Sequence, residues 1–154
     1  MNFKELKELD LYYNNISDIK VLEKVKFEKL KKLNLGSNRI ININILENAN
    51  FKELKELDLH DNNISDIKVL EKVKFEKLEK LNLGCNRISN INILENANFV
   101  KLKELDLSKN NISNIKVLEQ IKLEKLELLY LGYNNIDINE FSSISNNLKF
   151  KYYI

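Results

Sequence analysis

The 154-residue chain has no proline, no tryptophan, one cysteine, one histidine and three glycines. A single cysteine excludes an intramolecular disulfide and a cysteine-based zinc cluster, so we expect no metal site. The absence of disulfides favours a reducing compartment, and we expect a cytoplasmic protein. The glycines, Gly36, Gly84 and Gly132, stand 48 residues apart. They form no glycine-rich phosphate-binding loop, and we expect no cofactor.

Long hydrophobic runs are also missing. No stretch approaches the roughly 18 apolar residues of a membrane span, and the N-terminal MNFKELKELD lacks the apolar region of a signal peptide. Lys and Arg number 25 against 23 Asp and Glu, a net charge of +2. This balance does not steer the whole molecule toward nucleic acid or membrane, and glutamates interrupt the lysines along the chain. We expect neither kind of partner.

The chain is built on one repeated string, Leu-x-x-Leu-x-Leu-x-x-Asn-x-Ile. It recurs every 24 residues, beginning at Leu6, Leu30, Leu54, Leu78, Leu102 and Leu126. The apolar/polar alternation at the start of each string predicts a strand with one buried face. The remaining residues return the chain to the next strand in the same direction, which predicts parallel strands stacked sideways. Because one repeat cannot bury its own leucines, we expect a solenoid with a concave sheet.

This pattern resembles the leucine-rich repeat family. The spacing Asn-x-Ile-x-x-Ile-x-x-Leu is similar to a short-repeat class that includes phosphatase regulators, and also to bacterial internalins. The resemblance implies an α/β solenoid with a curved parallel sheet on the concave face and short helices or turns on the convex face. It also implies that the third, fifth, seventh and eighth positions of each string are exposed on the concave face. We expect six repeats over residues 1–136 and a C-terminal cap over 137–154.

Pairs of repeats form a longer unit of 48 residues. The first unit, 6–53, and the second unit, 54–101, agree at 41 of 48 positions. Odd repeats continue as SDIKVLEKVKFEK, which predicts a short helix on the convex side. Even repeats continue as ININILENANFKE, whose asparagines favour a tighter and less regular turn.

The two ends of the array differ. Residues 2–11 recur unchanged as residues 50–59, so the chain begins without a distinct N-terminal cap. This end would expose Phe3, Leu6 and Leu9, which predicts either a segment of a longer array or self-association through the open end.

The predicted C-terminal cap has three parts. Asp137 would cap a short helix that carries Ile138, Phe141 and Ile144. Asn146 and Asn147 then predict a turn. A final strand is predicted from the alternation of Leu148, Phe150, Tyr152 and Ile154.

Three columns of residues run along the predicted sheet. The third position alternates in charge through Glu8, Lys32, Glu56, Lys80, Glu104 and Leu128. At a strand spacing of about 4.8 Å these side chains would form a ladder of opposite charges. The fifth position alternates acids with asparagines through Asp10, Asn34, Asp58, Asn82, Asp106 and Tyr130. The ninth position is always Asn, and we expect these side chains to point inward and satisfy backbone groups. The first two columns are interpreted either as a solvated surface that sets register or as a docking surface for a charged partner.

The seventh and eighth positions vary most. Of the seven differences between the two units, four lie on the predicted strand face: Tyr12/His60, Tyr13/Asp61, Lys31/Glu79 and Ser37/Cys85. They are interpreted as specificity determinants on a fixed frame, with neutral drift as the alternative. Tyrosine is enriched at binding hot spots, although terminal tyrosines also shield the ends of an array. The predicted partner-binding residues are Tyr12, Tyr13, His60, Asp61, Lys109, Tyr130 and Tyr133.

No catalytic residues are predicted. His60 and Cys85 occupy adjacent repeats, but the sequence supplies no oxyanion donor or helix N-terminus to activate the thiol. We therefore expect a non-enzymatic scaffold that binds an unknown protein partner on its concave face. The alternative is a structural role, as part of a longer array or through the open N-terminal end.

Overall fold

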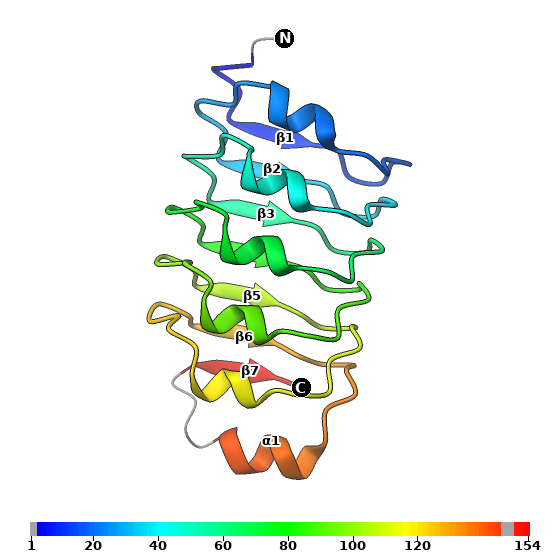
Figure 1. Cartoon of the computed structure of the whole chain (residues 1–154), viewed down its shortest axis with the longest axis vertical. Coiled ribbons are helices and arrows are strands. Elements are labelled where there is room, and N and C mark those ends of the chain that lie inside the picture. The colour runs from blue at the N-terminus through cyan, green and yellow to red at the C-terminus, as the bar shows by residue number, and fades with distance from the viewer. Residues whose placement is uncertain (1–2, 146–149) are drawn as a thin grey trace.

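The computed structural model describes residues 3–145 and 150–154. Its seven strands form one parallel sheet in sequence order, with each strand beside the next along the chain (Figure 1). The strands are β1 (Glu8–Asp10), β2 (Lys32–Asn34), β3 (Glu56–Asp58), β4 (Lys80–Asn82), β5 (Glu104–Asp106), β6 (Leu128–Tyr130) and β7 (Lys151–Tyr153). The predicted parallel solenoid is confirmed.

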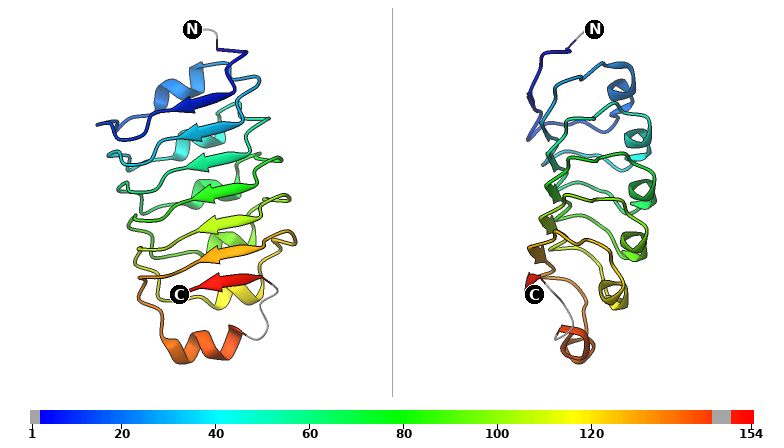
Figure 2. Two further views of the ribbon diagram at one scale, coloured as in Figure 1. Left: turned by 180° about the vertical axis from the view of Figure 1, so that it is seen from behind. Right: turned by 90° about the vertical axis from the view of Figure 1, so that its left-hand side faces the viewer.

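Short 3-10 helices form the opposite layer, as the edge-on view in Figure 2 shows. They are η1 (Lys20–Lys24), η2 (Asn44–Glu47), η3 (Lys68–Glu71), η4 (Asn92–Glu95) and η5 (Lys116–Glu119). The core lies between the two layers and is filled by the repeated leucines and isoleucines and by Phe27, Phe51, Phe75 and Phe99.

The predicted difference between odd and even convex segments is wrong, because both types form the same 3-10 helix. In odd repeats the Asp18 Oδ1 atom accepts the Lys20 N–H at 2.8 Å. In even repeats the Asn42 Oδ1 atom accepts the Asn44 N–H at the same distance. Asp and Asn thus make an equivalent local hydrogen bond, and the asparagines do not loosen the turn.

The ninth-position asparagines hold neighbouring repeats together. Asn38, Asn62, Asn86 and Asn110 are 5–8% exposed. Asn62 Nδ2 donates to Leu35 O of the preceding repeat at 3.0 Å and to two carbonyls of its own turn. Its Oδ1 atom accepts the Ile40 N–H at 2.9 Å. The inward, structural role predicted for this column is confirmed for these four asparagines, whereas Asn14 of the first repeat is exposed.

The C-terminal segment replaces the 3-10 helix of the sixth repeat with α1 (Ile138–Ser145), and β7 then extends the sheet. Asp137 Oδ1 accepts the Asn139 N–H at 2.7 Å at the start of α1. Phe141 and Ile144 are buried, whereas Ile138, predicted on the same face, is 60% exposed. Ile138 is the first residue of the helix and lies at its outer end. The turn predicted at Asn146 and Asn147, together with Leu148, falls outside the described residues.

Candidate functional site

A groove of about 370 Å³ runs along the concave face of β1 to β5. Its walls are the third and fifth columns, and its floor includes the buried leucines of the strands. The charged lining residues are six carboxylates and two lysines, a net charge of −4, and they are Glu8, Asp10, Lys32, Glu56, Asp58, Lys80, Glu104 and Asp106. The groove is therefore acidic, although the whole chain carries a charge of +2.

Among the described residues, the third column forms two separate ion pairs of the predicted ladder of opposite charges. Lys32 Nζ lies 3.3 Å from Glu56, and Lys80 Nζ lies 2.9 Å from Glu104. The hydrogen bond to Glu104 raises the pKa of Lys80 above its ordinary value. These pairs fix the register of neighbouring strands.

The fifth column has a structural role that the sequence did not reveal. Asp10 Oδ1 accepts the Tyr12 N–H at 2.9 Å, and Asn34 Oδ1 accepts the Gly36 N–H at 3.0 Å. Asp and Asn support the turn after each strand equally well, so the negative charge is not needed for the turn. Among the described residues, no lysine or arginine pairs with Asp10 or Asp106. Their charges are therefore available to a partner.

An aromatic cluster lies at the N-terminal end of the array, just after the carboxyl ends of β1 and β3. The rings of Tyr12 and His60 stack with centroids 5.8 Å apart, and the rings of Tyr12 and Tyr13 lie 6.0 Å apart. Tyr12 and His60 come from alternate repeats, and Gly36 lies between them. A Cβ atom at Gly36 would fall 2.5 Å from His60 Nδ1, so glycine is required for this contact. His60 Nδ1 also lies 2.9 Å from Asp58 Oδ1.

A second aromatic cluster stands at the C-terminal end. Tyr130 stacks on Tyr153 of β7 with ring centroids 4.9 Å apart. Partial burial of Tyr130, and the nearby Glu104 carboxylate, raise the pKa of the Tyr130 phenol. Lys109 Nζ lies 5.7 Å above the ring of Tyr133, a cation–π distance.

The eighth position of every repeat adopts a left-handed backbone conformation, with φ between 51° and 58°. Non-glycine residues rarely occupy this region. The residues are Tyr13, Ser37, Asp61, Cys85, Lys109 and Tyr133. The glycines stand one position earlier and have no positive φ, so they provide space rather than backbone freedom.

The predicted partner-binding residues thus gather at the rim of the groove and not inside it. Six of the seven follow the strands, at the seventh and eighth positions, and Tyr130 ends β6. Asp61 Oδ2 accepts a hydrogen bond from Ser37 Oγ at 2.8 Å. Sequence reasoning missed Tyr153 and did not assign the groove carboxylates to the site. The alternating acids of the two columns were the signal for these carboxylates.

Features of an enzyme or metal site are few. His60 hydrogen-bonds to Asp58, and no hydrogen bond joins it to Cys85 in the described part of the chain. Over residues 3–145 and 150–154, no three His, Cys, Asp or Glu side chains are grouped to hold a metal. No helix in these residues has the length and apolar character needed to cross a bilayer.

Comparisons with known proteins agree with this geometry. The model for two-copy leucine-rich repeats matches residues 4–48 and 52–96, and a second leucine-rich repeat model matches residues 76–136. No curated protein matches the chain.

Solved structures show the same fold. An internalin of Listeria monocytogenes, InlF, is 30% identical over 98% of this chain, with a TM-score of 0.76. A leucine-rich repeat protein of Leptospira interrogans is 29% identical over 98% of this chain, with a TM-score of 0.81. The chain spans 43% and 38% of the lengths of these two proteins. With family models matching most of its length, the chain belongs to the leucine-rich repeat family.

Proposed function

We propose that this chain is a non-enzymatic scaffold that binds a protein partner along the concave face of its sheet. Leucine-rich repeat proteins generally act as protein-interaction modules and typically lack enzymatic activity. The acidic groove is the observation that supports this assignment most directly. A groove that carries −4 in a molecule of charge +2 favours a partner segment rich in lysine or arginine.

The aromatic clusters at the N-terminal and C-terminal ends would hold the ends of such a segment. Tyr13 and Tyr133 are 79% and 84% exposed, so their rings are free to bury area against a partner. Tyrosine gives much contact area for little loss of side-chain entropy. The sheet is a rigid support, so binding would order few residues of the scaffold. A cytoplasmic location stays a prediction.

The chain itself supplies a conservative variant for testing the groove. Asp10→Asn, Asp58→Asn and Asp106→Asn together convert the odd fifth positions into the even type. Asn34 and Asn82 show that asparagine keeps the hydrogen bond to the seventh-position N–H. The variant should therefore fold normally while the groove loses three negative charges.

The experiment measures binding of labelled twelve-residue peptides (lysine-rich, glutamate-rich and uncharged) by fluorescence anisotropy at low salt. We expect the lysine-rich peptide to bind, and the triple variant to bind it roughly ten-fold or more weakly. The control variant carries Glu71→Gln, Glu95→Gln and Glu124→Gln, which remove the same charge outside the groove, and should bind as the parent does. Equal losses in both variants, or no binding of the basic peptide, would reject an acidic docking groove.

The rim is tested separately. Tyr130→Ala with Tyr133→Ala should weaken binding of the same peptide without unfolding the chain, as judged by circular dichroism. Unchanged affinity would remove the C-terminal aromatic cluster from the site.

A further inference from the structure

The two outer edges of the sheet, those of β1 and β7, carry third-position charges of opposite sign. In the described residues no strand pairs with the outer edge of β1 or with that of β7, and α1 lies beyond β7 at the same end of the array, where Phe141 contacts Tyr152 (Figures 1 and 2). Residues 2–11 are identical to residues 50–59, so β1 carries the same residues as β3, which receives β2 on the corresponding side. The outer edge of β1 therefore presents the same residues as the edge of β3 that pairs with β2.

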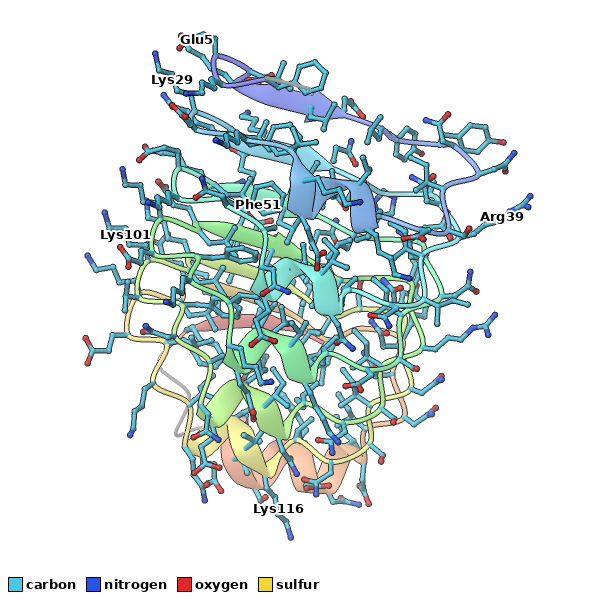
Figure 3. All side chains as sticks on the ribbon, turned by 45° about the horizontal axis from the view of Figure 1, so that its top comes forward. Glu5, Lys29, Arg39, Phe51, Lys101 and Lys116 are labelled. Carbon is cyan, nitrogen blue, oxygen red and sulfur yellow. The ribbon has the colours of Figure 1, made fainter. Side chains whose placement is uncertain are left out.

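Charges specify which strand fits that edge. Each interior strand with Glu at the third position receives a strand with Lys at the third position on its N-terminal side, as Glu56 receives Lys32 and Glu104 receives Lys80. Glu8 of β1 has no such neighbour on its outer side. The side chains ahead of the first four strands alternate in the same way. Figure 3 shows Lys29 beside Glu5, with Lys29 Nζ 2.8 Å from Glu5 Oε2. A parallel strand placed outside β1, with Lys at its third position, would continue the alternation of charge in the third column.

The outer edge of β7 presents such a strand. Lys151 pairs in register with Leu128, so it stands at the third position, and no carboxylate pairs with it among the described residues. The exposed apolar residues of this edge are Tyr152, Tyr153 and Ile154, and Phe3 is exposed near β1. Both edges therefore combine a charge without an ionic partner with apolar surface.

Backbone groups at the two edges also match. Within the array, the third-position N–H donates to the second-position carbonyl of the preceding repeat, and the sixth-position N–H donates to the fifth-position carbonyl of the following repeat. Glu56 N to Lys31 O and Leu35 N to Asp58 O are examples, at 3.0 and 2.8 Å. By the same rule the N–H of Glu8 and the carbonyl of Asp10 face outward from β1. On β7 the carbonyl of Phe150 and the N–H of Ile154 face outward.

We propose that copies of this chain associate head to tail, with β7 of one copy pairing in parallel with β1 of the next. Lys151 would lie opposite Glu8 of the partner, and Tyr152 opposite Leu9. The contact is heterologous, so each pairing leaves one free edge of each type and association continues beyond a dimer. This proposal does not rest on the concave-face function and can be tested apart from it through Lys151, which does not line the groove, whereas Glu8 does.

The competing arrangement pairs two β1 edges around a two-fold axis. An antiparallel pairing centred on Leu9 would set Glu8 opposite Asp10 of the other copy, and like charges directly opposite one another are destabilising. Glu8→Lys therefore separates the two arrangements, since it would strengthen a two-fold pairing and weaken a head-to-tail one.

The test is sedimentation velocity of the whole chain at low salt over a range of concentrations. We expect the parent to grow beyond a dimer, and Glu8→Lys or Lys151→Glu alone to weaken association roughly three- to thirty-fold. An equimolar mixture of the two variants should regain association, because each supplies the edge that the other accepts. Glu71→Lys and Lys68→Glu, with the same charge changes on the convex side, should behave as the parent.

Three results would overturn the proposal: a parent that stays monomeric, stronger association of Glu8→Lys, or a mixture no more associated than its components. Circular dichroism of each variant establishes that the fold is retained. Peptide binding in the groove, measured on the same samples, should be unchanged by Lys151→Glu, so failure of one proposal is distinguishable from failure of the other.

Discussion

The first and second 48-residue units have nearly the same sequence but different surroundings. Leu57 of the second unit is 1% exposed, whereas its counterpart Leu9 is half-buried. Asn62 is buried among four hydrogen bonds, whereas its counterpart Asn14 is exposed and makes two. The residues are identical, so the difference comes from the neighbours. Each repeat in a solenoid is stabilised by the repeats on either side, and the first described repeat has a neighbour on one side only.

The comparison predicts that one substitution has different costs in the two units. Leu57→Ala should lower the free energy of unfolding by about 2–5 kcal/mol, because it leaves a cavity between packed repeats. Leu9→Ala should cost about 1 kcal/mol, because its side chain is already partly in water. Urea unfolding followed by circular dichroism measures both. Equal costs would mean that the first repeat is covered in solution, as head-to-tail association would also produce, so the measurement belongs at concentrations where the chain is monomeric.

The asparagine column gives a smaller difference of the same kind. Asn62→Ala should cost about 2 kcal/mol, because it leaves the Ile40 N–H buried without its acceptor and removes one of the two side-chain donors to the Leu35 carbonyl. Asn14→Ala should cost about 0.5 kcal/mol, because water replaces its bonds to Leu11 and Tyr12. The same urea titration compares the pair. Asn62→Asp should cost at least as much as Asn62→Ala, because it sets a buried carboxylate oxygen against the carbonyls that Asn62 Nδ2 contacts.

The sequence predicted the parallel sheet, the inward asparagines and the third-position ladder because each depends on contacts between adjacent repeats, which recur at a fixed spacing. It did not predict the stack of Tyr12 on His60 across Gly36, because that contact joins residues two repeats apart and depends on the space that one glycine leaves. Tyr153 was missed because β7 lies outside the repeated string, so its register on β6 follows from α1 and the chain after it.

The convex 3-10 helices show a second reason why a prediction from sequence failed. The prediction treated the segments after Asp18 and Asn42 as different structures, because the even segment is richer in asparagine. The packed neighbours and the same hydrogen bond to the second N–H give both the same 3-10 turn. Tertiary context therefore outweighed local preference.

The smallest expected effect concerns one position that differs between the two units, which is Lys31 in the first unit and Glu79 in the second. Glu79 lies between two lysines, 3.0 Å from Lys55 Nζ and 3.1 Å from Lys103 Nζ. Hydrogen bonds from these two lysines lower the pKa of the Glu79 carboxyl below its ordinary value of 4.5. Lys31 instead stands in a column with Lys7 and Lys55, joined by backbone hydrogen bonds. Lys31→Glu should therefore slightly raise the free energy of unfolding at neutral pH, and Glu79→Gln should slightly lower it.

The pH dependence tests the electrostatic origin of this effect. A carboxyl whose pKa is lowered by folding contributes stability above its unfolded-state pKa, and this contribution is lost as the pH falls through the folded-state pKa. The deficit of Glu79→Gln relative to the parent should therefore be present at pH 7 and shrink as the pH falls below the ordinary value of 4.5. Unfolding free energies of the parent, Glu79→Gln and Lys31→Glu across this range measure it. A deficit that persists unchanged in acid would show that Glu79 acts through packing and that the unit difference is not one of charge.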